Sequence, residues 1–256
     1  MIEWAEVAPG TVLMATAETA WLHRLAPLDP FARPMDGPGA VETTRTLLDA
    51  AIGFFQRRRL AQAAPALTKE GYAERLVGYY HGGHTTPPLL RRAAQRFEGA
   101  GRPELVAWAR ATAEDEDHDH FALADLGELG YPPGVVPTLP CPPFMAALIA
   151  YFEACVDGPE PVACLGYIYA LERSSSLIQP SYIEAIDRLL GPGVRATRCL
   201  RWHSSMGAEP VHVDRLLGTV AALPAGDRCC VVRAVYETSR ILFAESEPRE
   251  RRPPNG

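Results

Sequence analysis

Apolar residues recur three and four positions apart from about residue 41 to residue 246, which is the spacing of one helical face. Clusters of Gly and Pro interrupt this pattern, as in YPPG and GPG. No segment alternates apolar and polar residues over the length of a strand. Helices with short connections pack as an antiparallel bundle, so an all-α fold is expected. We predict helices at about 41–62, 68–84, 86–98, 102–130, 142–157, 160–178, 180–190, 193–222 (interrupted) and 226–246.

The two ends of the chain depart from the helical pattern. Residues 1–40 are rich in Pro and Gly (LAPLDPFARPMDGPG), which predicts an irregular arm packed on the domain. The tail (ESEPRERRPPNG) is charged and rich in proline, a composition typical of disorder. The expected organisation is an N-terminal arm (1–40), one helical domain (41–246) and a disordered tail (247–256).

Composition narrows the class of protein. The 256 residues are 47% hydrophobic, enough for one sizeable core. A net charge of −6, with acids spread along the chain, leaves no basic stripe for nucleic acid. The N-terminus (MIEWAEVAPG) lacks the pattern of a signal peptide, and no window of 18 apolar residues exists. We therefore expect a cytoplasmic protein that does not bind a membrane. The six cysteines form no CxxC pair and are interpreted as reduced core residues.

One carboxylate falls on an apolar helical face. Leu165, Ile168, Tyr169, Glu172 and Ser176 share one side of the predicted helix 160–178. An unpaired buried carboxylate costs on the order of several kcal/mol or takes up a proton. Glu172 is therefore expected to face either a metal ion or an arginine, and the segment alone does not separate the two.

A second inward acid is predicted beside a histidine. Trp108, Asp115 and His118 lie three to seven residues apart and share a face, which makes Asp115 and His118 an (i, i+3) carboxylate and imidazole pair. Glu114 competes with Asp115 for this position. The alternative is a solvated acidic face, which such runs of charge more often form.

A third group lies in ERLVGYYHGGHTT, where Glu74, His81 and His84 share a face of the predicted helix 68–84. Gly and Pro-Pro follow, so His84 is expected at or beyond the helix end. A histidine at a helix end is usually exposed and without a role, which is the alternative to a ligand here.

The stretch WHSSMGAEPVHVD contains two histidines separated by helix breakers. In an unbroken helix His203 and His212, nine residues apart, face opposite sides. A break near Gly207 and Pro210 would turn Glu209 and His212 toward the side of His203. The alternative is a plain loop that leaves both histidines at the surface.

Together these helices supply three or four histidines and three carboxylates that are expected to face inward. Imidazole and carboxylate ligands in this ratio suit a pair of iron or manganese ions. Zinc hydrolysis is chemically allowed, but one zinc ion needs three protein ligands and would leave half of the set unexplained.

The order of these motifs resembles the heme-oxygenase-like diiron oxidases, also called iron-containing redox enzymes. The motifs are His118 preceded by an acid, DLGELG (125–130), GYIYALE ending in Glu172, and a histidine-rich helix from His203, and the resemblance covers about residues 45–245. It implies the seven-helix bundle of heme oxygenase, shared with cofactor-free relatives of the thiaminase and pyrroloquinoline-quinone (PQQ) synthase type.

The resemblance also implies a ligand set. His118, Glu172 and His203 match the family pattern in type and separation. The first family glutamate falls at His81, with Glu74 and His84 as alternatives, and the second corresponds to Asp115 or Glu114. Glu209 and His212 match the Asp and the second His of the last family motif only if this sequence carries two extra residues after His203. Such an insertion fits a family whose third metal helix is pliable.

The implied function is that of a non-heme diiron oxidase. Two Fe(II) ions would activate O2 to oxidise a small, amino-acid-like substrate by desaturation, C–H or N oxidation, or C–C cleavage in specialised-metabolite biosynthesis. An external electron donor and a homodimer are compatible with it. Tyr80, Tyr169 and Met206 are candidates for the substrate pocket, and Arg173 or Arg201 for a substrate carboxylate. The competing classes are a cofactor-free thiaminase-like or PQQ-synthase-like enzyme, a heme-binding relative, and a non-catalytic helical binding protein.

Overall fold

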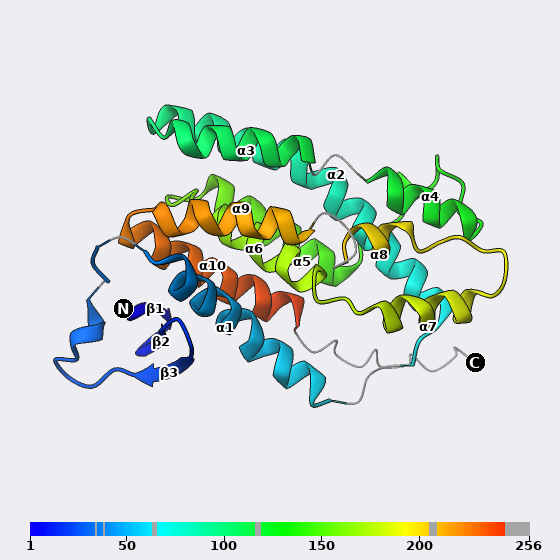
Figure 1. The fold of residues 1–256 in the computed structure, drawn as a ribbon. Helices are drawn as coiled ribbons and strands as arrows, with labels where there is room; N and C mark the ends of the chain where they lie inside the picture. Colours follow the sequence, from blue (N-terminus) through cyan, green and yellow to red (C-terminus); the bar gives the residue numbers. More distant parts are fainter. Residues whose placement is uncertain (34, 38, 63–65, 116–118, 205–208, 244–256) are drawn as a thin grey trace, which may run out of the picture.

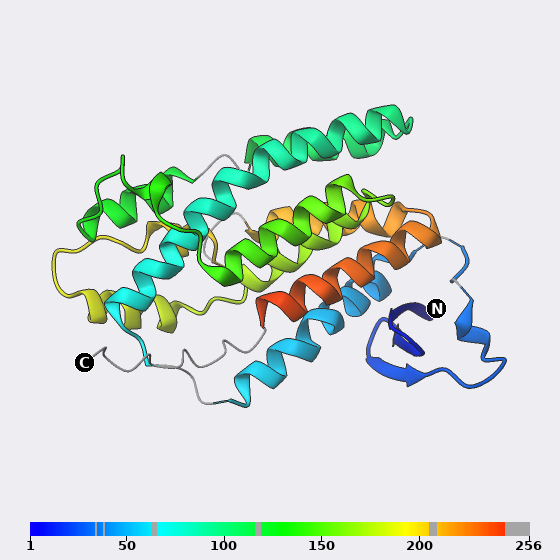
Figure 2. The same cartoon turned by 180° about the vertical axis from the view of Figure 1, so that it is seen from behind.

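The computed structural model describes residues 1–33, 35–37, 39–62, 66–115, 119–204 and 209–243. Most of them form helices arranged as a bundle (Figures 1 and 2). The helices are α1 (Val41–Leu60), α2 (Lys69–Gly99), α3 (Pro103–Asp115), α4 (His120–Glu128), α5 (Pro143–Asp157), α6 (Ala163–Ser175), α7 (Pro180–Leu190), α8 (Arg198–Trp202), α9 (Glu209–Ala222) and α10 (Ala225–Leu242), with single 3-10 turns at Pro30–Ala32 and Val136–Thr138.

The first 24 residues correct the prediction of an irregular arm without strands. They form an antiparallel sheet in the order β1 (Glu3–Ala8), β2 (Thr11–Ala15) and β3 (Ala20–Arg24). Gly10 has a φ of +67° and so accommodates the tight turn between β1 and β2. The sheet lies at one end of the bundle against α1 and α10 (Figure 1).

A buried ionic contact explains how β1 is held. Glu3 is only 2% exposed and accepts hydrogen bonds from the Thr44 hydroxyl (2.9 Å) and the Ala40 backbone amide (3.2 Å). The guanidinium Nε of Arg228 lies 3.7 Å from the same carboxylate. A buried charge requires such partners, and these come from α1, the residue before it and α10. The strand therefore depends on contacts that are distant in sequence.

The core divides into two groups of buried side chains. One fills the space between the sheet, α1, α3, α5, α6, α9, α10 and the C-terminal half of α2. The other lies between the N-terminal half of α2 and α4, α7 and α8. None of the described helices combines the length and the apolar character that crossing a membrane requires.

Two helix boundaries differ from the prediction. The expected helices 68–84 and 86–98 are one helix, α2, which contains Pro87 and Pro88. Each proline removes one backbone donor. The carbonyls left without that donor belong to Gly83, which is half-buried, and His84, which is exposed. The expected helix 102–130 is two helices, α3 and α4, on either side of residues 116–118.

Candidate functional site

A small cavity lies where α3, α6 and α9 meet. Its volume is about 10 Å³, close to what a single water molecule or cation requires. Carboxylates from α3 and α6 face an imidazole and a guanidinium from α9, with apolar side chains around them. The lining residues are Trp108, Thr112, Asp115, Glu172, His212, Arg215 and Leu216.

Helical periodicity brings these side chains to one place. On α3, Trp108, Thr112 and Asp115 are spaced four and three residues apart. On α9, His212, Arg215 and Leu216 follow the same rule. Two of these residues, Thr112 and Arg215, were missed from the sequence, although their spacing from Asp115 and His212 could have indicated them.

One guanidinium group lies beside the acids of the cavity. The Nη1 of Arg215 lies 3.3 Å from the Oδ2 of Asp115, so one positive group faces two carboxylates. Glu172 is the more buried of the two acids, with 7% of the residue exposed, whereas the Asp115 side chain is 40% exposed at the edge of the cavity.

The separation of the nearest donor atoms is informative. The Nε2 of His212 lies 3.8 Å from the Oδ2 of Asp115. This is too long for a hydrogen bond. Two ligand atoms at about 2.1 Å from one cation lie between about 3.0 and 4.2 Å apart, depending on the angle at the ion. The pair is therefore spaced as two ligands of one cation would be.

The described residues do not complete a metal site by themselves. In the described ranges, no three side chains of His, Cys, Asp or Glu lie close enough together to hold a metal ion. The predicted ligand His118 and the predicted pocket residue Met206 lie outside the described residues. Glu209 is the first residue of α9, but its side chain is not described.

The structure places the other predicted ligands elsewhere in the described part of the chain. The Nε2 of His81 lies 3.0 Å from the carbonyl oxygen of Leu139, and the Nδ1 of His84 lies 2.9 Å from the carboxylate of Asp119. His203 follows α8, with its ring centroid 6.1 Å from that of Tyr79. None of these three histidines lines the cavity between α3, α6 and α9.

The remaining candidates are also away from that cavity. Glu74 and Glu114 are exposed on α2 and α3. Tyr80 is buried, and its ring stacks on His84 at 5.5 Å between centroids. Arg201 pairs with Asp187 through its Nη2 at 2.8 Å, so its charge is already balanced.

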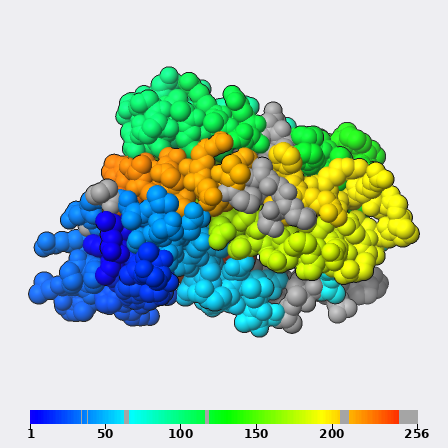
Figure 3. Space-filling model, in the orientation of Figure 1, coloured from blue at the N-terminus to red at the C-terminus, as the bar shows by residue number. Residues whose placement is uncertain are grey.

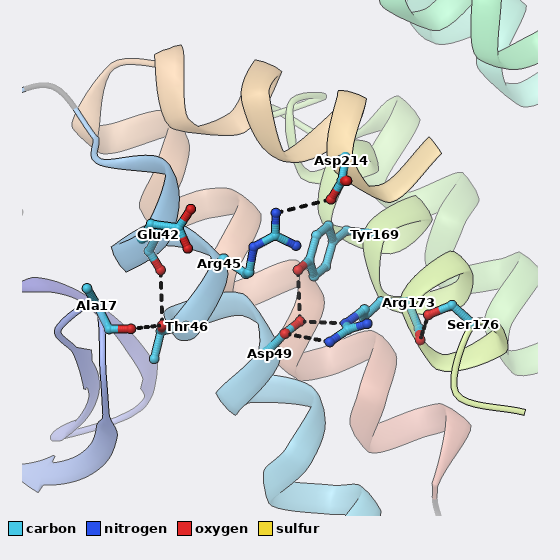
Figure 4. A network of polar contacts seen from close by, with 9 residues as sticks. All are labelled: Ala17, Glu42, Arg45, Thr46, Asp49, Tyr169, Arg173, Ser176 and Asp214. Atoms are coloured by element: carbon cyan, nitrogen blue, oxygen red, sulfur yellow. Dashed lines mark hydrogen bonds and ion pairs between the residues drawn. The ribbon is translucent and has the colours of Figure 1, made fainter. Parts of the chain in front are cut away.

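A polar network joins α1 to α6 and α9 (Figure 4). Asp49 accepts hydrogen bonds from the Tyr169 hydroxyl at 2.8 Å and from Nε and Nη2 of Arg173 at 3.0 and 2.9 Å. The Nη2 of Arg45 lies 3.1 Å from the Asp214 carboxylate. The structure thus places Tyr169 and Arg173, both predicted substrate contacts, on Asp49, and α1 holds both α6 and α9.

The Tyr169 hydroxyl is held in its neutral form. Burial raises the pKa of Tyr169 far above its ordinary value, and the negative charge of Asp49 raises it further. The hydroxyl therefore acts as a hydrogen-bond donor to Asp49. It ties the residue one turn before Glu172 to α1.

Comparison with known proteins identifies the fold. No protein-family model matches the sequence, and no curated protein does. Several solved structures are similar, including the following two. One is a domain of unknown function with a heme oxygenase-like fold from Shewanella denitrificans (20% identity, TM-score 0.54, 78% of this chain and 85% of that one). The other is a TenA homolog from Pseudomonas syringae (14% identity, TM-score 0.56, 82% and 95%).

These similarities confirm the expected fold class: the chain is a helical protein with a heme oxygenase-like fold, to which a small antiparallel sheet is added at the N-terminus. At such low identity the comparison concerns the fold alone.

Proposed function

We propose that this protein is a non-heme diiron oxidase, with the first iron ion held in the cavity between α3, α6 and α9. The observation that carries the proposal is the meeting of Asp115, Glu172 and His212, from three separate helices, around a space of the size of one ion. Two carboxylates and an imidazole are a donor set that suits iron or manganese.

The lining of the cavity is of a type that binds cations. Two carboxylates lie in it beside Arg215. Asp115, Glu172 and His212 would supply part of the ligand set, since these three do not complete a metal site by themselves. The remaining ligands would include His118 and Glu209, which the resemblance also indicates. Bound Fe(II) would supply the electrons that reduce O2.

The surrounding side chains prepare the cavity for this chemistry. Trp108 and Leu216 exclude bulk water from its walls, which strengthens electrostatic interactions inside. Arg215 offsets part of the carboxylate charge and so limits the repulsion between Asp115 and Glu172 before an ion binds. On α1, Asp49 and Arg45 hold the two helices that bear Glu172 and His212.

The reaction class follows from the resemblance rather than from the cavity. We propose oxidation of a small, amino-acid-like substrate, with an external electron donor. The cavity of about 10 Å³ has room for an ion and not for a substrate, so the substrate would bind beside it.

Metal stoichiometry tests the proposal. The protein is loaded anaerobically with Fe(II), desalted, and its iron is measured by mass spectrometry. About two irons per chain are expected, with at least one lost in Glu172→Gln and in His212→Gln. The matched controls are Glu153→Gln on α5 and His120→Gln on α4, which change exposed residues of the same types. No iron in the wild-type protein, or equal iron in the site and control variants, would refute the proposal.

A second candidate is a cofactor-free enzyme, favoured by the similar fold of the TenA homolog. A chemistry based on a cysteine nucleophile requires a thiolate. Burial raises the pKa of Cys155 to about 11 and that of Cys230 to about 12, and it also raises the pKa of Cys141 and Cys229. These thiols are protonated at neutral pH. Turnover of a candidate substrate that persists in a metal chelator would favour this function over the diiron proposal.

A further inference from the structure

A second hollow lies at the other end of the domain, on α7, α8 and the loop between them. It is an open groove of about 780 Å³, within the range of sites for small organic molecules. Figure 3 shows these elements in yellow at the end of the molecule opposite the N-terminal sheet. No residue that lines this groove also lines the cavity between α3, α6 and α9.

The groove has an unusual charge for this chain. Four arginines line it, Arg188, Arg195, Arg198 and Arg201, with Asp187 as the one acid among its lining residues. The protein as a whole carries a net charge of −6. Arg198 and Arg201 are paired with acids, so the positive potential that an anion would meet comes chiefly from Arg188 and Arg195.

Two of the arginines are held in place by acids around the groove. Arg198 pairs with the buried Asp125 at 3.2 Å and with Glu128 at 3.1 Å. Arg201 donates to Asp187 and, through its Nε, to the Thr197 hydroxyl at 3.2 Å. These contacts fix the two guanidinium planes before any ligand arrives, which lowers the entropy cost of binding.

The other two arginines retain their donors. The nearest acid to Arg188 is Glu184, at 3.9 Å and mostly exposed on the same helix. For Arg195, no side-chain hydrogen bond or close ion pair is found in the described ranges, and the nearby Glu128 interacts with its charge. Both side chains are exposed, one on α7 and one on the loop before α8. They can therefore move onto a ligand from two sides without breaking a strong contact.

We infer that this groove binds the phosphate end of a small phosphorylated molecule. A phosphate group offers three acceptor oxygens and up to two charges, which match the paired donors of several guanidinium groups. Pro192 and Val194 provide apolar surface for the organic part of the ligand. This site does not depend on the metal proposed above.

Calorimetric titration with inorganic pyrophosphate at low salt tests the inference. Binding to the full-length protein is expected, and it weakens about tenfold or more in the double variant Arg188→Gln/Arg195→Gln, since each charge-assisted hydrogen bond contributes this order of affinity. High salt weakens it as well. The control is Arg24→Gln/Arg91→Gln, which removes two exposed arginines on β3 and α2 and is expected to bind as the wild type does.

Three results would overturn the inference: no binding of pyrophosphate to the wild-type protein, equal weakening in the groove and control variants, or citrate binding as tightly as pyrophosphate. The last result would indicate a general anion patch rather than a phosphate site. Arg188 and Arg195 are exposed, so the circular dichroism spectrum of the double variant should equal that of the wild type. With the fold unchanged, weaker binding in the variant reports the loss of the arginine contacts to the ligand.

Discussion

The contact between α1 and α6 should contribute measurably to stability, and Asp49→Ala tests it. Three hydrogen bonds end on the Asp49 carboxylate, from Tyr169 and from two nitrogens of Arg173. The side chains of Asp49 and Arg173 are 28% and 31% exposed, so water compensates for part of the lost charge interaction. The loss of this ion pair should therefore lower the free energy of unfolding by about 1–2 kcal/mol. The Tyr169 residue is fully buried, and a buried hydroxyl without an acceptor costs about 1–2 kcal/mol more.

The expected loss in the free energy of unfolding is therefore about 2–4 kcal/mol, measured by urea denaturation. Tyr169→Phe, which removes one bond and leaves no unpaired hydroxyl, should cost about 1 kcal/mol. Asp157→Ala is the matched control. Asp157 pairs with Arg92 at 2.8 Å, the length of the hydrogen bond between Tyr169 and Asp49, but the side chains of Asp157 and Arg92 are 56% and 44% exposed. This exposed pair should contribute less than about 1 kcal/mol.

A double-variant cycle separates the pair from its surroundings. Asp49→Ala combined with Arg173→Ala should cost less than the sum of the two single changes, by about 1–2 kcal/mol. A loss below about 0.5 kcal/mol in Asp49→Ala, or a loss no larger than in Asp157→Ala, would show that the network does not fasten α6 to α1.

Two further predictions concern packing and pH. A Cβ on Gly166 would lie 2.3 Å from the carbonyl oxygen of Val231, so Gly166→Ala should lower the free energy of unfolding, measured in urea, by about 3 kcal/mol or more. Gly127 has open space around the position of a Cβ, so Gly127→Ala should change this free energy by less than about 1 kcal/mol. Equal effects of the two changes would contradict close packing of α6 on α10. Burial raises the pKa of the Cys155 thiol to about 11. The stability that the buried neutral thiol contributes is fully present below its unfolded pKa, near 9, and is lost as the pH rises toward 11. The fall in the free energy of unfolding over this pH range should therefore be smaller in Cys155→Ala.

The parts of the fold that depend on local pattern were predicted well. The three-to-four residue spacing on 160–176 predicted that Glu172 faces the interior, and Glu172 is buried. Asp115, predicted inward from the spacing on 102–115, lines the same cavity but is exposed at its edge. Their role as metal ligands stays a prediction. The break between His203 and His212 is also present, since α8 ends at Trp202 and α9 begins at Glu209.

The parts that depend on distant contacts were not predictable. The sheet was missed because β1 is fastened by Arg228, more than 200 residues away, which allows a charged residue such as Glu3 to be buried in a strand. The direction of His81 depends on the carbonyl of Leu139, which belongs to a loop whose path no periodic pattern describes. Helical spacing identifies the face of a helix, whereas the partner of that face is decided by tertiary packing.

The role of α1 follows from the same distinction. This helix supplies none of the predicted ligands, so chemical motifs alone leave it out of the site. Its Asp49 nevertheless holds Arg173, the neighbour of Glu172, and its Arg45 pairs with Asp214, two residues after His212 (Figure 4). Both contacts join helices that line the cavity to α1. Because ligand atoms must be held within a few tenths of an ångström, the geometry of the proposed iron site depends on α1 as much as on the ligands themselves.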